Sequence, residues 1–131
     1  MLAKGARLAQ VRPASTAVTE AFTTNLPIAE ITSIYVANTS GAAATFRMFH
    51  SLGSADVTDE STALFWDKNV PTADTFIIRA EAMGSGIMVG NKQLDKIFVR
   101  SSVANALTFT FYGVTASAAE ASASLQRAGQ M

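Results

Sequence analysis

His50 is the only histidine in the chain and the residue type best suited to acid–base chemistry near neutral pH. A hydrolytic triad around it would need a nucleophile and an orienting carboxylate, for which Ser51 and Asp56 are the candidates. Sequence neighbours rarely form such a triad, and the chain has no nucleophile-elbow motif. We therefore interpret His50 as a structural residue and predict that the protein is not an enzyme.

Three carboxylates, Asp56, Asp59 and Glu60, lie in a polar stretch expected to form a loop at 52–61. Carboxylate oxygens are preferred ligands of Ca²⁺, so this loop could hold a hard cation. The spacing matches no EF-hand loop, and a solvated acidic loop is the simpler interpretation. We predict no metal and no cofactor.

The other residues with chemical potential also have structural interpretations. Gly84-Ser85-Gly86 precedes neither a helical pattern nor a phosphate-loop lysine, and it predicts a tight turn. Asn38-Thr39-Ser40 matches the glycosylation sequon, which we attribute to chance because no secretion signal precedes it. Trp66 and Tyr112 could stack on a sugar, but we expect both in the core or at its edge.

Length and composition indicate a single domain with a weakly charged surface. The 131 residues are 49% hydrophobic and include 8 Phe, enough for one core. Ten basic and ten acidic residues cancel, and the charged fraction of 15% lies below the ~25% of ordinary soluble domains. Such surfaces favour association, so we predict a homo-oligomer or a larger assembly. No basic stripe is present, and we expect no nucleic-acid partner.

The sequence also excludes several classes of protein by what it lacks. Without cysteine there is no disulfide, zinc–thiolate site or thiol catalysis. No apolar run approaches the ~20 residues that span a bilayer, so we expect no membrane partner. Residues 1–12 lack the apolar core of a signal peptide, and we expect synthesis in the cytoplasm without export.

The stretch 96–114 has the clearest strand pattern. Strict period-two alternation places Leu107, Phe109 and Phe111 on one side and Thr108, Thr110 and Tyr112 on the other. The residues before it alternate in the same way, with Ile97 and Val99 against Phe98 and Arg100. Because residues 101–105 suit a short loop, we predict a β-hairpin whose phenylalanine face is covered by a second sheet.

Short strands separated by turn residues are expected along the rest of the chain, at 16–24, 28–38, 45–51, 62–67, 74–80 and 84–90, with a possible edge strand at 8–11. Eight or nine such strands predict an all-β fold, a single antiparallel β-sandwich or jelly roll at 16–114. Residues 1–15 are interpreted as an N-terminal arm. The Ala- and Ser-rich residues 115–131 are interpreted as a C-terminal tail that could be helical.

The run NTSGAAATFR at 38–47 resembles a recurrent segment in small virion proteins of tailed bacteriophages, where a strand ending in Asn-Thr leads through Ser, Gly and Ala to Ala-Thr-Phe-Arg. TALFWD at 62–67, ADTF at 73–76 and SVANALTF at 102–109, closing on Tyr112-Gly113, are also similar. The resemblance covers residues 16–114, without the arm and the tail. It implies a non-enzymatic β-sandwich component of the virion, on the capsid, at the neck or along the tail.

Our first hypothesis is a capsid decoration or cement protein that binds the major capsid protein in a virion assembled in the host cytoplasm. The arm and tail are expected to make the contacts, partly by strand addition, and linked contacts strengthen one another. The residues predicted to bind the partner are Leu2, Arg7, Leu8, Val11, Arg12, Leu125 and Met131. Deleting residues 1–12 is expected to leave the sandwich folded while abolishing binding.

The alternative hypothesis is a neck, tail or tail-fibre accessory protein that takes part in host recognition. In that case the loops at 52–61 and 81–92 would contact a receptor or a glycan. Substitutions at Asp56, Asp59 and Trp66 would then reduce adsorption without affecting particle assembly.

Overall fold

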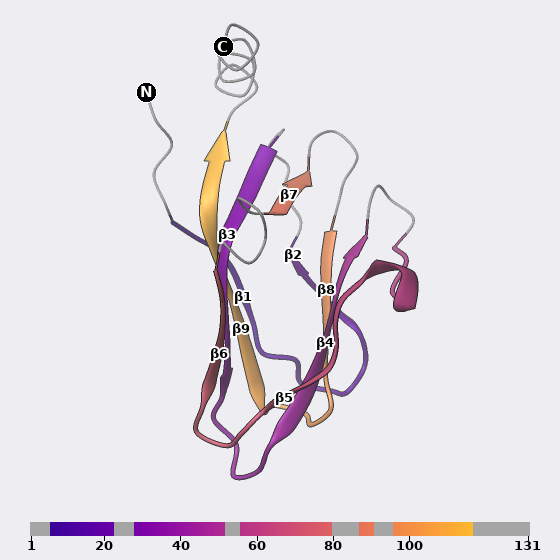
Figure 1. Ribbon diagram of the computed structural model, residues 1–131, viewed down its shortest axis with the longest axis vertical. Helices are drawn as coiled ribbons and strands as arrows, with labels where there is room; N and C mark the ends of the chain where they lie inside the picture. Colours follow the sequence, from indigo (N-terminus) through magenta and orange to yellow (C-terminus); the bar gives the residue numbers. More distant parts are fainter. Residues whose placement is uncertain (1–5, 23–27, 52–55, 80–86, 91–95, 117–131) are drawn as a thin grey trace, which may run out of the picture.

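The computed structural model describes residues 6–22, 28–51, 56–79, 87–90 and 96–116, which form an antiparallel β-sandwich (Figure 1). This confirms the predicted fold class. In chain order the elements are β1 (Ala6–Val11), β2 (Thr19–Phe22), β3 (Ile28–Asn38), β4 (Ala44–Ser51), the 3-10 helix η2 (Glu60–Thr62), β5 (Ala63–Val70), β6 (Thr75–Arg79), β7 (Ile87–Gly90), β8 (Lys96–Ser101) and β9 (Leu107–Ala116). In this part of the chain, no helix is long and apolar enough to cross a bilayer.

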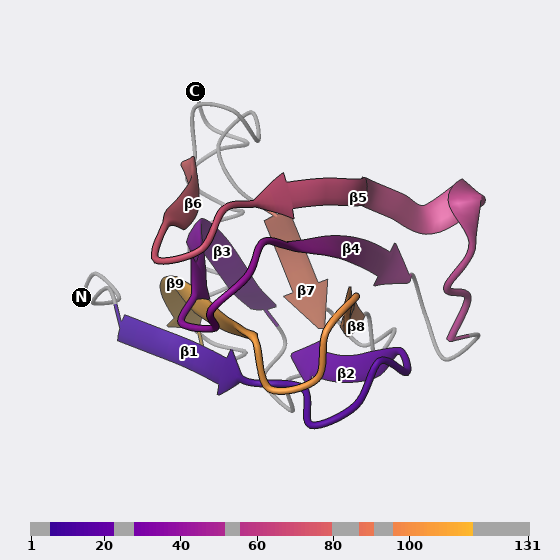
Figure 2. The ribbon, with the colours of Figure 1, turned by 90° about the horizontal axis from the view of Figure 1, so that it is seen from below.

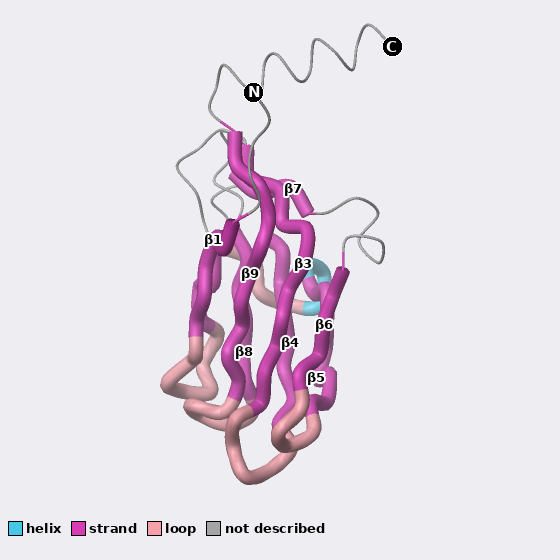
Figure 3. The backbone as a smooth tube through the Cα atoms, turned by 90° about the vertical axis from the view of Figure 1, so that its left-hand side faces the viewer, coloured by secondary structure: helices cyan, strands magenta, loops and turns pink. Residues whose placement is uncertain are grey.

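Two sheets face each other across the core (Figures 2 and 3). One has the strand order β1-β9-β3-β6, with β7 also paired to β3, and the other has the order β2-β8-β4-β5. β6 and β7 lie along one side of β3, opposite residues 33–37 and 28–31 respectively. Without β7, the two orders are those of an eight-stranded jelly roll, in which most connections cross between the sheets.

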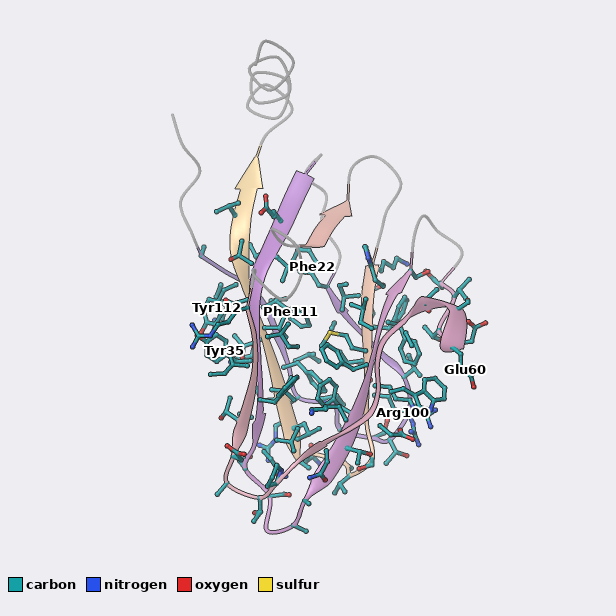
Figure 4. All side chains as sticks on the ribbon, viewed as in Figure 1. Phe22, Tyr35, Glu60, Arg100, Phe111 and Tyr112 are labelled. Atoms are coloured by element: carbon teal, nitrogen blue, oxygen red, sulfur yellow. The ribbon has the colours of Figure 1, made fainter. Side chains whose placement is uncertain are left out.

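The core is built from alternate residues of both sheets. Phe109 and Phe111 of β9 are fully buried, whereas Tyr112 is 39% exposed on the outer side. Phe46 of β4 meets Phe109 of the opposite sheet edge to face, with ring centroids 5.6 Å apart. Phe22 and Phe111 also lie between the sheets, with ring centroids 6.5 Å apart (Figure 4). The alternation predicted for β9 is therefore confirmed.

The predicted hairpin of β8 with β9 is wrong, because the two strands lie in different sheets. β8 pairs with β2 and β4, and β9 pairs with β1 and β3. The connection crosses from one sheet to the other, and Ser102 donates its N–H to the carbonyl of Thr45 at 2.9 Å. Asn105 likewise donates to the carbonyl of Pro13 at 2.9 Å. Apolar alternation in both strands is equally compatible with strands that cover each other across a core.

β1 is an edge strand of the five-stranded sheet, as the pattern at 8–11 predicts. It pairs antiparallel with β9 from Ala6, opposite Gly113, to Val11, opposite Phe109. Leu8 and Val11 pack against the core at this edge.

This pairing moves the start of the sandwich from residue 16, as expected from the sequence, to residue 6. Arg12, which follows β1, donates from Nε to the carbonyl of Asn105 at 2.9 Å, and Pro13 is buried. Deleting residues 1–12 would remove an edge strand and its core contacts, so it is not a clean test of a free arm. At the other end of the domain, β9 continues to Ala116.

The chain enters β1 and leaves β9 at the same end of the sandwich, the upper end in Figures 1 and 3. The pairing of Ala6 with Gly113, close to the end of β9, fixes this arrangement. The β3–β4, β5–β6 and β8–β9 turns lie at the opposite end (Figure 1). Residues 1–5 and 117–131 are therefore joined to the sandwich at a common end.

Candidate binding surface

Two of the residues considered for a hydrolytic triad, His50 and Ser51, lie on different faces of β4. Neighbouring strand residues point to opposite sides of a sheet. His50 is opposite Ile97, a core residue, whereas Ser51 is opposite Lys96. Asp56 Oδ1 pairs with Lys96 Nζ at 3.0 Å on the Ser51 side. His50 and Ser51 therefore do not face a common site.

The acidic residues at 56–60 have separate structural roles. Asp56 pairs with Lys96, and Asp59 caps η2 by accepting the Ser61 N–H at 2.8 Å. Hydrogen bonds from the Ser61 hydroxyl and N–H hold the pKa of Asp59 below its usual range. Among the residues that the structure describes, no group of three or more His, Cys, Asp or Glu side chains is placed to hold a metal ion.

The outer face of the four-stranded sheet carries a group of side chains that we call the Trp66 cluster (Arg47, Phe49, Trp66 and Asp67). Trp66 is 44% exposed on the edge strand β5, contrary to its expected place in the core or at its edge. The guanidinium carbon of Arg47 lies 3.7 Å from the centroid of the indole. Phe49 meets the indole edge to face at 6.2 Å. The exposed area of Trp66 is therefore the part of the indole that these two side chains leave uncovered.

A β-bulge in β5 creates this cluster. The register of β4 against β5 shifts at Arg47, where one residue of β4 faces two of β5. These two are Trp66 and Asp67, and the bulge turns both toward the outer face. Asp67 has a φ of 54°, in the left-handed region that few non-glycine residues adopt. Aspartate is one of the non-glycine residues that adopt this region most readily, so it suits the bulge position.

Arg47 and Asp67 form a bidentate ion pair beside the indole, with Nε–Oδ1 at 2.7 Å and Nη2–Oδ2 at 3.1 Å. The hydrogen bond from Arg47 lowers the pKa of Asp67 below its usual range, and the same bond raises the pKa of Arg47. Because the pair lies at the surface, with Asp67 exposed and Arg47 partly exposed, it contributes little to stability. Its main effect is to hold the guanidinium over the ring.

We predict an acid transition in the fluorescence of Trp66, the only tryptophan in the chain. Since the folded-state pKa of Asp67 is lowered, the ion pair is complete above the unfolded-state pKa of about 3.9. It is lost as the pH falls through the lower folded-state value. The emission should therefore stay constant from neutral pH to about pH 4 and change below it. The Asp67→Asn variant should show altered emission already at neutral pH. A wild-type midpoint above about pH 4, with folded protein by circular dichroism, would contradict the assignment.

Trp66 also lines a shallow, open depression on the outer surface. The other lining residues lie in η2 and just before it, namely Thr58, Asp59, Glu60 and Ser61. Figure 4 shows Glu60 projecting from this corner of the molecule. The depression therefore combines one aromatic ring with hydroxyl and carboxylate groups.

The outer face of the five-stranded sheet presents a second group of exposed side chains. Tyr35 and Tyr112 meet edge to face, with ring centroids 5.5 Å apart, and project away from the core (Figure 4). Ile77 lies opposite Tyr35 on β6 and is also exposed. Toward β1, Gln10 Nε2 donates to Thr110 Oγ1 at 2.9 Å. Arg7 lies opposite Tyr112 on the same face. Exposed surfaces that combine aromatic residues with arginine are typical of protein interfaces.

The predicted partner-binding residues that the structure describes lie in β1 and just after it. Leu8 and Val11 pack against the core of their own chain. Arg7 and Arg12 are exposed and form hydrogen bonds within the chain. The remaining members, Leu2, Leu125 and Met131, lie outside the described residues. Contact of this set with a partner stays a prediction.

The sequence at 62–67 contains a signal that Trp66 is exposed. The expectation that Trp66 lies in the core or at its edge overlooked this signal. Phe65 packs inward, with its ring 5.5 Å from that of Phe46. In an extended strand its neighbours Leu64 and Trp66 must then face outward, as they do.

The chain matches no protein-family model and no curated protein. Among solved structures, it is similar to one of infectious bursal disease virus (Gx strain), with 13% sequence identity and a TM-score of 0.46. The alignment spans 88% of this chain and 38% of the viral chain. The function must therefore be inferred from the residues of this chain.

Proposed function

We propose that this protein is a non-enzymatic structural component of a tailed-bacteriophage particle, and that it decorates the capsid as a cement protein bound to the major capsid protein. Jelly rolls occur in viral capsid proteins but also in lectins and cupins, so the fold alone is only compatible with this role. The resemblance of residues 38–47 and of later segments to phage virion proteins supports the narrower choice.

The observation that carries the proposal is the common end at which the chain enters β1 and leaves β9. A capsid subunit that receives residues 1–5 and 117–131 would hold the sandwich by this one end. Binding of the first segment makes binding of the second intramolecular, so two weak contacts give a tight attachment. The two sheet faces remain available to neighbouring copies.

The outer face of the five-stranded sheet supports contacts between such copies. Tyr35, Tyr112 and Ile77 offer aromatic and aliphatic area without a carboxylate among them. The formal net charge of zero means that neighbouring copies do not repel one another strongly. We therefore propose that the protein self-associates on the particle.

Deleting residues 117–131 should reduce occupancy of the particle by about tenfold or more, because it removes one of two linked contacts. The deletion removes no residue of β9, which ends at Ala116, so the melting temperature should be unchanged. The measurement adds wild-type or truncated protein to purified particles that lack it, followed by quantitative staining and cryo-electron microscopy.

The control is the Trp66→Ala variant. It removes an exposed side chain from β5 and leaves residues 1–5 and 117–131 intact. It should bind particles like the wild type. Equal occupancy for the truncated and wild-type proteins would refute the proposed role of residues 117–131.

A tail or host-recognition role is the second candidate, and the exposed Trp66 cluster favours it. The position of the protein on the particle separates the two. Copies distributed over the whole shell support decoration, whereas a few copies at the neck or along the tail support the alternative.

A further inference from the structure

Trp66 is exposed on the surface, although burying a large aromatic side chain would stabilise the folded protein. Its contacts are with Arg47 and Phe49 on the outer face of the sheet, and it lines the depression beside η2. We propose that this depression binds a neutral saccharide, with one face of a pyranose ring stacked on the exposed part of the Trp66 indole. This inference goes beyond the capsid role and does not depend on it.

The aromatic platform is rigid before any ligand arrives. Arg47 lies over one face of the indole, with its guanidinium carbon 3.7 Å from the ring centroid, and is itself held by two hydrogen bonds to Asp67. Phe49, which is 1% exposed, packs perpendicular to the indole. Preformed sites lose little conformational entropy on binding, so even a small contact area can give measurable affinity.

The polar groups around the ring match the edge of a sugar. A pyranose presents C–H groups on its faces and hydroxyl groups around its rim, and each hydroxyl both donates and accepts hydrogen bonds. Beside Trp66, the depression offers the hydroxyl of Thr58, the hydroxyl oxygen of Ser61, whose proton is bonded to Asp59, and the carboxylates of Asp59 and Glu60. An aromatic face bordered by such groups satisfies both parts of the ligand.

The charges of the site disfavour an anionic ligand. Asp59 and Glu60 border the depression and repel anionic groups such as phosphates or sugar acids. A cation could stack on a free tryptophan face. The Arg47 guanidinium on one face is paired with Asp67, so a basic side chain of a partner protein is the competing occupant. The hydroxyl groups of Thr58 and Ser61 beside the ring favour the sugar.

The test uses the full-length protein and two measurements. A microarray of neutral oligosaccharides identifies a sugar, and saturation-transfer NMR with that free sugar then gives its affinity. Trp66→Ala should weaken binding by about tenfold or more. The matched control is Tyr112→Ala, which removes a similarly exposed aromatic residue from the opposite sheet, and it should bind within about twofold of wild type.

Glu60→Gln distinguishes a sugar from a cation, because the amide keeps hydrogen-bonding capacity but loses the charge. Sugar binding should persist within about threefold. No binding to any neutral sugar would overturn the proposal, as would equal binding by folded Trp66→Ala. Binding of N-acetyl-lysine methylamide that is lost in Glu60→Gln, with no sugar bound, would also overturn it and indicate a basic partner side chain.

Discussion

The Gly113→Ala variant should be less stable than the wild type by about 3 kcal/mol, a large part of the stability of a domain this size. Gly113 lies in β9 where the register against β3 shifts between Ile31 and Ser33. A Cβ added there would lie 1.9 Å from the carbonyl oxygen of Glu30 and 2.9 Å from its carbonyl carbon. Both are backbone atoms of the paired strand and cannot rotate away. The central strands of the sheet would have to separate to admit one methyl group.

Urea unfolding followed by circular dichroism measures this effect. Gly41→Ala is the matched control, because a Cβ at Gly41 meets nothing within 4 Å. It should change the free energy of unfolding by no more than about 0.5 kcal/mol. If Gly113→Ala were as stable as Gly41→Ala, the close approach of β3 and β9 at this point would be disproved.

Strand positions could be predicted wherever one side of a strand is apolar. The strand expected at 28–38 is found with the same bounds, and Ile34 and Val36 are fully buried as the alternation predicts. The same holds for β4, where Phe46 and Met48 face the core. Alternation reports which face of a strand is buried, and that property is local.

The pairing of strands could not be predicted in the same way, because alternation does not identify the neighbouring strand. β8 and β9 show the pattern of a hairpin but lie in opposite sheets. β1 belongs to the sandwich because it pairs with the edge of β9. β9 is distant in sequence, so the residues of β1 alone do not indicate this partner. In a jelly roll most connections cross the core, so the assumption that consecutive strands pair fails repeatedly.

The Trp66 cluster depends on a feature that has no clear sequence signature. A bulge turns Trp66 and Asp67 together toward Arg47, and it requires a non-glycine residue with positive φ. Strand alternation alone predicts that Trp66 faces outward, but not that a guanidinium stacks on it. The carboxylates at 56–60 were visible in the sequence, whereas their separate partners, Lys96 and Ser61, were not.

Replacing Asn38 with alanine should cost about 3 kcal/mol, the second large effect that we expect. Asn38 is 2% exposed, and its amide Nδ2 donates to the carbonyls of Ala42 and Val70 at 2.9 Å each. Its Oδ1 accepts from the N–H and hydroxyl of Ser40 at 2.9 and 2.8 Å. The side chain thus joins the end of β3 to the end of β5 in the opposite sheet. The sequon at 38–40 therefore has a structural explanation, because its asparagine amide is buried and fully bonded.

Thermal and urea unfolding of two further variants separate these contributions. Asn69→Ala removes an exposed asparagine from β5 and should change stability by no more than about 0.5 kcal/mol. Asn38→Asp keeps an acceptor for Ser40 but points an oxygen at the carbonyls of Ala42 and Val70. At neutral pH it should therefore be at least as destabilising as Asn38→Ala, because repulsion is added to the lost donor. If Asn38→Asp were close to wild type, the link between the two sheets through Nδ2 would contribute little, and the turn around Ser40 alone would explain why asparagine occupies this position.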